Sequence, residues 1–188
     1  MRIYEKLILT ILITSFGFAD GITFRGKSVE AMAQETIPLA FQHFVESELD
    51  LPHLTNLNRG SYLIIVPDGL VSYLDQFVSF KKSQGFDVNV SLLSEAGSSS
   101  DEIKTFIGAT LAEDPMLEYV LLIGDVDGFA ALPSFYYGPE NDVSDQKYSH
   151  LLGDDIVPDV FIGRMSVDNL TDLIVILSKT MKYARDPL

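Results

Sequence analysis

The stretch EYVLLIGDVDGFAALPSF, residues 118–135, joins a buried-looking run of apolar side chains to two aspartates. Five hydrophobic residues at 119–123 lead into Gly124, and Asp125 and Asp127 follow it with a second glycine close behind. A short apolar run that ends in turn residues predicts a strand buried on both faces of a sheet. The fold therefore depends on what this strand pairs with, and the function on what the two carboxylates do.

Three further strands are predicted on either side of this one in the chain. The apolar run at residues 62–66 predicts a second central strand, and residues 160–162 predict another strand. Apolar and polar residues alternate over residues 86–92, which predicts an edge strand with one face in water.

Helical patterns separate these strands. Apolar residues recur at helical spacing over residues 70–81, and Gly85 is a suitable stop. Ser99 and Glu102 have the spacing of a capping box that opens the next helix, and a last helix starts near Leu170. Strand–helix alternation with right-handed crossovers predicts a three-layer α/β fold with strand order 2-1-3-4, of the caspase-like or flavodoxin-like kind.

In such a sheet the carboxyl ends of all strands meet at one edge, where ligands usually bind. We therefore expect Asp68, Asp125, Asp127 and Arg164 at this edge, each just past the end of a strand. Aspartates beside glycines commonly form turns and bond loop amides, and a carboxylate can also pair with the guanidinium of Arg164.

Two metal-binding interpretations also fit the aspartates. Asp125 and Asp127 could hold Mg²⁺ or Mn²⁺ against a nucleotide-sugar diphosphate, as in glycosyltransferases, because hard cations prefer clustered carboxylate oxygens. A calcium-stabilised loop could instead use DVDG together with the acidic ENDVSD. The segment PDG after the first strand matches neither of the glycine-rich patterns that bind phosphate.

Composition excludes several classes of function. The formal net charge is −14, with 27 acidic against 13 basic side chains, and no basic stripe reverses it locally, which argues against nucleic-acid binding. The chain has no cysteine, so it holds no disulfide, thiolate zinc site or cysteine nucleophile of its own. Its 3 histidines lack the spacing of a zinc site.

The N-terminus has the pattern of a secretory signal peptide. Arg2 and Lys6 precede an uncharged, mostly apolar run of about 13 residues, which is too short for a comfortable membrane span. Small residues at Gly17 and Ala19 suit cleavage after Ala19. We expect residues 1–19 to be the signal peptide, with an uncleaved anchor as the alternative, and residues 20–58 to be a linker or the remnant of a pro-segment.

Three segments in the rest of the chain share a further likeness. They are YLIIVPDGLVSYLDQFVSFKKSQGFDVNV, EYVLLIGDVDGFAALPSF and VSDQKYSHLLGDDIVPDVFIGRMSV, in that order. In order and spacing they resemble the first half of the catalytic domain of gingipain-type cysteine peptidases. The resemblance covers about residues 60–188, so we expect residues 59–188 to form the N-terminal subdomain only, as an incomplete catalytic domain.

The resemblance implies a caspase-like fold, secretion to the cell exterior or the cell surface, and cysteine-type proteolysis in the intact enzyme. It also implies that the histidine and cysteine of the catalytic dyad belong to a second subdomain, so no catalytic residue is assigned here. His150 has no thiol to deprotonate and is expected to be a loop residue. The family requires no cofactor but carries calcium, which makes Asp125, Asp127, Asp142 and Asp145 candidate ligands.

These observations lead to three hypotheses. The first is the N-terminal portion of a secreted gingipain-like endopeptidase, with protein or peptide substrates, whose catalytic subdomain lies beyond this chain. The second is a secreted, non-catalytic α/β module that binds a partner protein or calcium. The third is the metal-dependent transferase, which secretion disfavours because nucleotide sugars are scarce outside cells. None of the three includes nucleic acid or a membrane span after signal cleavage.

Overall fold

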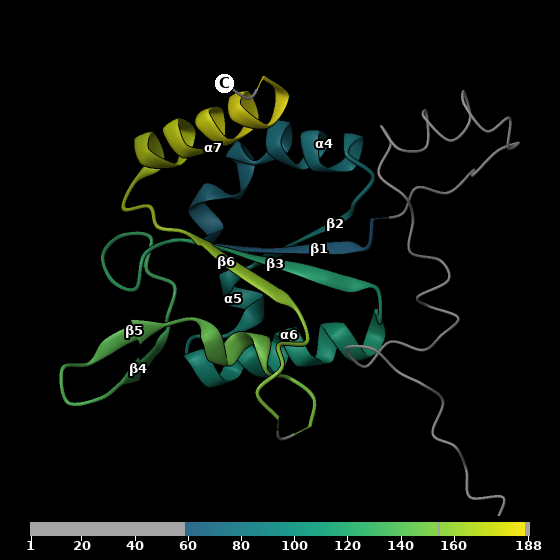
Figure 1. Ribbon diagram of the computed structural model, residues 1–188. Coiled ribbons are helices and arrows are strands. Elements are labelled where there is room, and N and C mark those ends of the chain that lie inside the picture. The colour runs from purple at the N-terminus through teal and green to yellow at the C-terminus, as the bar shows by residue number, and fades with distance from the viewer. Residues whose placement is uncertain (1–58, 154, 187–188) are drawn as a thin grey trace, which may run out of the picture.

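The computed structural model describes residues 59–153 and 155–186, and its centre is a four-stranded parallel sheet (Figure 1). The strand order is β2-β1-β3-β6, which confirms the predicted order 2-1-3-4 and the α/β class. The expected signal peptide and the segment 20–58 lie outside the described residues. The strands are β1 (Ser61–Val66), β2 (Asp87–Leu92), β3 (Leu117–Ile123) and β6 (Phe161–Met165).

Helices cover both faces of the sheet and produce three layers (Figure 1). Helices α4 (Asp75–Ser83) and α7 (Leu170–Arg185) lie on one face, where Phe77, Leu173 and Leu177 join one buried cluster. Helices α5 (Leu93–Ala96) and α6 (Ser100–Glu113) lie on the other face and contribute to a second cluster. Among the described residues, no helix combines the length and the apolar character needed to cross a membrane.

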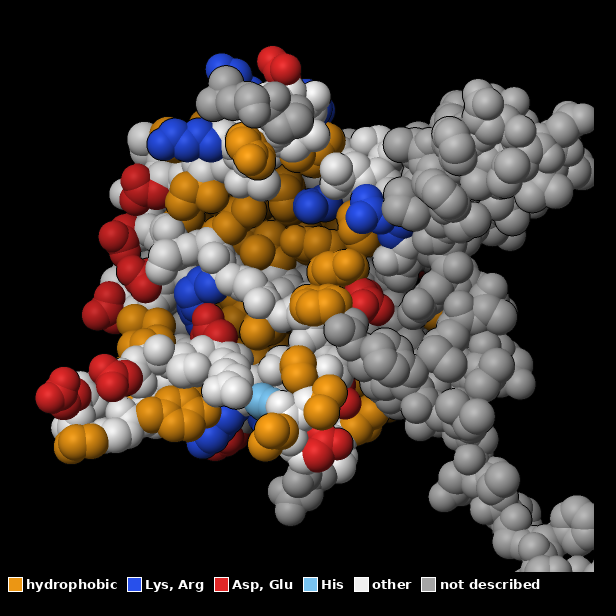
Figure 2. Space-filling model, in the orientation of Figure 1, with side chains coloured by type: hydrophobic (Ala, Val, Ile, Leu, Met, Phe, Trp, Pro, Cys, Tyr) orange, Lys and Arg blue, Asp and Glu red, His pale blue; other side chains and the backbone are white. Residues whose placement is uncertain are grey.

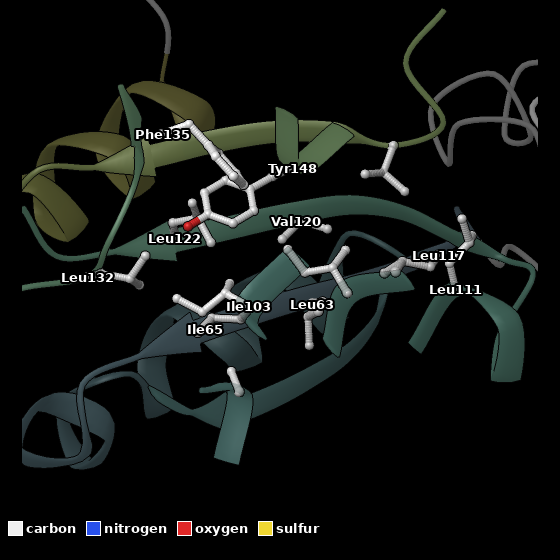
Figure 3. Close-up of a cluster of buried hydrophobic side chains, with 13 residues drawn as sticks. Leu63, Ile65, Ile103, Leu111, Leu117, Val120, Leu122, Leu132, Phe135 and Tyr148 are labelled. Atoms are coloured by element: carbon white, nitrogen blue, oxygen red, sulfur yellow. The ribbon is translucent and has the colours of Figure 1, made fainter. Parts of the chain in front are cut away.

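The central strands are apolar along their length because helices cover both faces of the sheet. In β1, Leu63 and Ile65 point into the cluster on the α6 side, while Ile64 and Val66 point into the cluster on the α4 and α7 side. Successive side chains of a strand point to opposite faces, so a strand covered on both sides needs apolar residues at every position. Figure 3 shows the α6-side cluster, which includes the buried ring of Tyr148.

The edge position of β2 is confirmed, although its alternation is incomplete. Val88 is 6% exposed, whereas Val90 on the same side of the strand is 36% exposed. The capping box is also present, because the hydroxyl of Ser99 accepts from the Glu102 amide at 3.3 Å and the Glu102 carboxylate accepts from the Ser99 amide at 3.1 Å.

The helix predicted over residues 70–81 is divided into two pieces. A 3-10 helix, η1 (Asp68–Tyr73), follows β1, and α4 begins after Leu74. The apolar spacing correctly marked the inner face, since Leu70 and Leu74 are both buried. Pro67 precedes η1, and this short turn redirects the chain from the end of β1 before α4 begins. Gly85 follows α4 with a φ of 92°, which confirms it as the stop.

The last strand is longer than predicted, and further short elements precede it. β6 extends to Met165, so Arg164 lies within the strand and not past its end. Gly163 and Arg164 interrupt the apolar pattern, and for that reason the prediction stopped at residue 162. The stretch between β3 and β6 contains an antiparallel hairpin and a 3-10 helix: β4 (Phe135–Tyr137), β5 (Asp142–Ser144) and η2 (Gln146–Ser149).

Candidate functional site at the carboxyl ends of the strands

Asp68 and Asp125 lie at the carboxyl ends of β1 and β3, as predicted. Asp68 comes directly after Pro67 at the end of β1 and accepts hydrogen bonds from the hydroxyl of Ser94 at 2.6 Å and from its amide at 3.3 Å. These hydrogen bonds from Ser94, led by that of its hydroxyl, lower the pKa of Asp68. Because Ser94 belongs to α5, the contact joins the end of β1 to the helix that follows β2.

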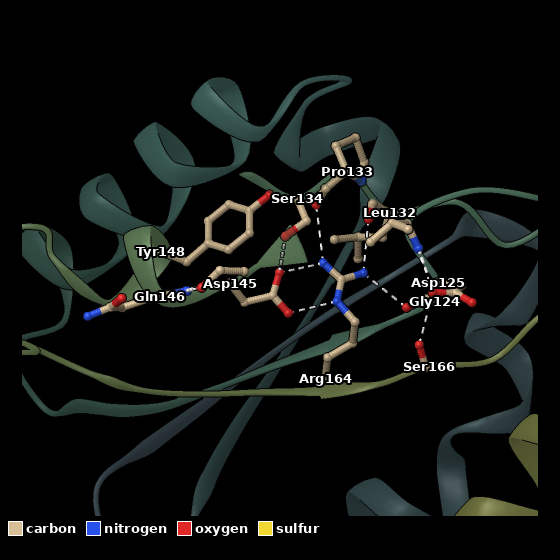
Figure 4. Close-up of polar contacts among 12 residues, drawn as sticks. Gly124, Asp125, Leu132, Pro133, Ser134, Asp145, Gln146, Tyr148, Arg164 and Ser166 are labelled. Carbon is tan, nitrogen blue, oxygen red and sulfur yellow. Dashed lines mark hydrogen bonds and ion pairs between the residues drawn. The ribbon is translucent and has the colours of Figure 1, made fainter. Parts of the chain in front are cut away.

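Arg164 is the centre of the polar network at this edge (Figure 4). Its side chain is only 10% exposed, and it forms a bidentate pair with Asp145, in which Nε and Nη2 each lie 2.8 Å from one carboxylate oxygen. The remaining guanidinium hydrogens reach three backbone carbonyls, those of Gly124 at 3.0 Å, Leu132 at 2.9 Å and Pro133 at 3.2 Å. A guanidinium carries five N–H donors, so Arg164 uses all of them.

Two further side chains complete what we call the Arg164 network. The Ser134 hydroxyl donates to Asp145 at 2.6 Å, and the Tyr148 hydroxyl donates to the Pro133 carbonyl at 2.7 Å. The network therefore ties four segments together: β6, the end of β3, the loop that leads to β4, and the turn after β5. The sequence predicted a carboxylate partner for Arg164, and the structure identifies it as Asp145 and not as an aspartate that follows a strand.

Gly124 allows the chain to bend sharply as it leaves β3. Its φ is 132°, and a Cβ atom at this position would lie 2.3 Å from the Ala130 carbonyl oxygen. The loop then folds back toward the end of β3, and the Leu132 amide donates a hydrogen bond to the Asp125 carbonyl at 2.6 Å. The local sequence Gly-Asp thus folds the loop back so that the carbonyls of residues 132 and 133 face Arg164.

The ion pair of Arg164 and Asp145 influences the ionisation of Asp145 itself and of the neighbouring Tyr148. Burial alone would raise the pKa of Asp145, but hydrogen bonds from Arg164 and Ser134 and the positive charge of Arg164 outweigh burial, and the pKa is lowered. Burial raises the pKa of Tyr148, and the Asp145 charge raises it further while Arg164 opposes them. At neutral pH the network therefore holds an ionised Asp145 and a neutral Tyr148.

We expect Asp145 to make the stability of the chain dependent on acid pH. Its pKa is lower in the folded than in the unfolded state, so its stabilisation is complete above the ordinary carboxyl pKa of about 4 and is lost as the pH falls through the folded value. Urea unfolding between pH 3 and pH 7 should show a slope that Asp145→Asn reduces and that Ser134→Ala reduces by a smaller amount. An unchanged slope in Asp145→Asn would contradict this assignment.

The four candidate metal ligands have different surroundings in the structure. Asp125 accepts from the Val126 amide at 2.8 Å and the Ser166 hydroxyl at 3.0 Å, and Asp127 is exposed. Asp142 lies on strand β5, and Asp145 is bound to Arg164. Within residues 59–153 and 155–186, no three or more acidic or histidine side chains are grouped in a way that could hold a metal ion. Calcium binding stays a prediction.

His150 and Asp159 brace the loop before β6. The Nε2 atom of His150 lies 3.2 Å from the Ile156 carbonyl, in keeping with its expected place as a loop residue. Asp159 is only 8% exposed and accepts from the amides of Leu151 at 2.6 Å and Leu152 at 2.8 Å. Sequence reasoning assigned no structural role to Ser134 or Asp159, although an aspartate after proline in an apolar context was an available signal.

The fold and this edge together define a class of protein. A parallel sheet in the order β2-β1-β3-β6, covered by helices on both faces, is the arrangement of the first part of a caspase-like α/β domain. The polar side chains at its carboxyl edge are bonded to each other and to loop backbone, and among the described residues they include no cysteine.

Comparison with known proteins identifies the family. Residues 55–188 match the family model described as peptidase family C25, and the chain belongs to this family. It is 25% identical over 191 residues to Gingipain R2 of Porphyromonas gingivalis, an alignment that covers 99% of this chain and 25% of that protein. It is 28% identical over 133 residues to Gingipain R1 of the same organism, covering 68% of this chain and 13% of that protein.

The solved structures agree with these relatives. The crystal structure of the Arg-specific cysteine proteinase gingipain R matches with a TM-score of 0.59 and 28% identity, and the match covers 66% of this chain and 28% of that chain. The complex of the pro- and mature domains of the Porphyromonas gingivalis enzyme matches with the same TM-score and identity. The chain therefore spans about a quarter of the length of Gingipain R2 and of these structures.

Proposed function

We propose that this chain is the N-terminal portion of a secreted, gingipain-like cysteine endopeptidase and acts as the scaffold of its catalytic domain. In the intact enzyme a cysteine thiolate attacks the scissile carbonyl of a protein or peptide substrate, and a histidine carries the proton. Both residues are supplied by sequence beyond residue 188. The part described here holds the sheet against which that second subdomain is positioned.

One observation carries this proposal: a chain that belongs to a cysteine peptidase family over residues 55–188 contains no cysteine. A nucleophile that is absent from these residues must come from elsewhere if the protein hydrolyses peptides through a thiolate. The Arg164 network fits the scaffold role, because it fixes the loops at the carboxyl edge of the sheet, where the active sites of open α/β sheets are usually built.

Secretion and calcium complete the proposal. The apolar run after Arg2 and Lys6 supports export with removal of residues 1–19, and an exported protein that begins at Asp20 would verify this cleavage. No cofactor is required for thiolate chemistry. Calcium would act on stability only, and it would be detected as a rise in the melting temperature when CaCl₂ is added to the chelator-treated protein.

The DNA that follows codon 188 tests the proposal directly. We expect the reading frame to continue into one strand followed by Gly-His-Gly and another followed by Ala-Cys, the positions that the family resemblance implies for the dyad. A stop codon directly after codon 188 would contradict the peptidase and favour the alternative, a secreted, non-catalytic module that binds a partner protein or calcium.

A further inference from the structure

Two cationic side chains meet one buried ring at the amino end of the sheet, the edge opposite the Arg164 network. Arg59 lies just before β1, and its amide donates to the Gly85 carbonyl at 2.8 Å, which fixes it beside the end of α4. The guanidinium carbon of Arg59 lies 4.6 Å from the centre of the Phe86 ring. The Nζ atom of Lys81, near the end of α4, lies 5.6 Å from the same ring centre.

Aromatic rings form the floor on which these cations lie. Phe86 is only 8% exposed, and its ring meets that of Tyr62 edge to face at 5.5 Å. The Nζ atom of Lys81 also lies 5.1 Å from the centre of the Tyr62 ring and 5.5 Å from that of Phe77. Figure 2 shows basic side chains next to hydrophobic ones on this side of the molecule, between α4 and the sheet. Ring faces attract a cation but do not neutralise its charge.

The two cations lack an acidic partner in the part of the chain that the structure describes. No aspartate or glutamate there lies within ion-pair distance of Arg59 or Lys81. The chain has 27 acidic side chains against 13 basic ones, so a shortage of carboxylates does not explain this. Burial lowers the pKa of Lys81, and the nearby charge of Arg59 lowers it further. The pair is therefore a concentration of positive charge without a compensating anion.

We propose that Arg59 and Lys81 form a binding site for an oxyanion, namely a carboxylate, sulfate or phosphate group, beside the Phe86 ring. The guanidinium presents paired N–H donors that match a group with two oxygens, and the ammonium adds three rotatable donors. Arg59 is exposed and Lys81 is half-buried, so the site is open to solvent. The inference goes beyond the proposed function and does not depend on it, because the site lies at the other edge of the sheet.

Melting temperatures of the 188-residue chain in sulfate and in chloride, at equal ionic strength, test the site. For the parent, about 20 mM sulfate should raise the melting temperature by at least about 2 °C more than chloride does. Lys81→Met and Arg59→Met remove one charge each and should lose this increment. Lys82→Met is the matched control, because Lys82 is the next residue of α4 and is exposed, and it should keep the increment.

Acylation of the lysines provides a second readout that needs no variant. A succinimidyl ester reacts with the neutral amine, and a bound oxyanion both favours the ammonium form of Lys81 and covers it. We expect sulfate to slow the acylation of Lys81 at least about threefold relative to that of Lys82, as measured by mass spectrometry of the digested protein. Equal slowing of the two lysines, or an equal sulfate increment in the parent and all three variants, would overturn the proposal.

The same acylation assay identifies the source of the oxyanion. A short peptide of glutamates and inorganic sulfate are titrated separately, and the protection of Lys81 is compared with that of Lys82. Protection by the peptide at a lower concentration than sulfate assigns the site to the acidic side chains of a polypeptide. Protection by sulfate alone assigns it to a free ion. Either result supports an oxyanion site, and protection by neither probe overturns it.

Discussion

Arg164→Ala should lower the free energy of unfolding by about 3–5 kcal/mol, the typical cost of removing one partner of a buried ion pair. Asp145 is only 20% exposed and would keep its charge without the two guanidinium hydrogen bonds. The carbonyls of Gly124, Leu132 and Pro133 would lose their donors as well. Urea unfolding of the parent and the variant at pH 7 measures the difference.

A double-mutant cycle separates the charge pair from the other contacts of Arg164. We expect Arg164→Met with Asp145→Leu to be more stable than Arg164→Met alone, because the uncompensated carboxylate is removed. Arg164→Lys should recover part of the loss, since lysine keeps the charge but not the five-donor fork. A loss below about 1 kcal/mol in Arg164→Ala would show that the network contributes no more than a surface pair.

Gly124→Ala should cost about 3 kcal/mol or more, through a clash and backbone strain that act together. A methyl group there would lie 2.3 Å from the Ala130 carbonyl oxygen, and the φ of 132° is one that residues with a side chain rarely adopt. The loop that returns Leu132 and Pro133 to Arg164 would have to move. Thermal unfolding followed by circular dichroism detects this change.

Gly163→Ala is the matched control for Gly124→Ala. It is also a glycine at the carboxyl half of a strand, but its added methyl group would meet no atom within 4 Å. We expect its effect to stay within about 0.5 kcal/mol, the range of ordinary surface substitutions. Equal losses in the two variants would mean that Gly124 is not a special position and that the described geometry of its loop is wrong.

The sheet could be predicted because its signals are local. The runs at residues 62–66 and 119–123 are apolar at every position, and burial on both faces requires this. The split of the helix at Leu74 and the extension of β6 through Arg164 were missed, since both depend on tertiary contacts. A charged residue within a strand is acceptable here only because Asp145, 19 positions earlier, pairs with it.

The candidate site was predicted in outline and not in detail. Sequence placed Asp68, Asp125, Asp127 and Arg164 just past strand ends at the carboxyl edge, because parallel strands end together, but Arg164 lies within β6. It could not show that Asp145 would be the partner of Arg164, since the hairpin that brings it there consists of two 3-residue strands. The role of Ser134 follows from the same loop geometry, and no spacing rule links residues 134, 145 and 164.

Peptide hydrolysis tests most directly the claim that these residues are a scaffold whose chemistry lies beyond them. The 188-residue chain and the product of the whole reading frame would be assayed on the same fluorogenic peptides, with and without prior alkylation by iodoacetamide. We predict turnover by the whole product that alkylation abolishes, and none by the 188-residue chain. Equal turnover by both proteins, insensitive to alkylation, would contradict the account.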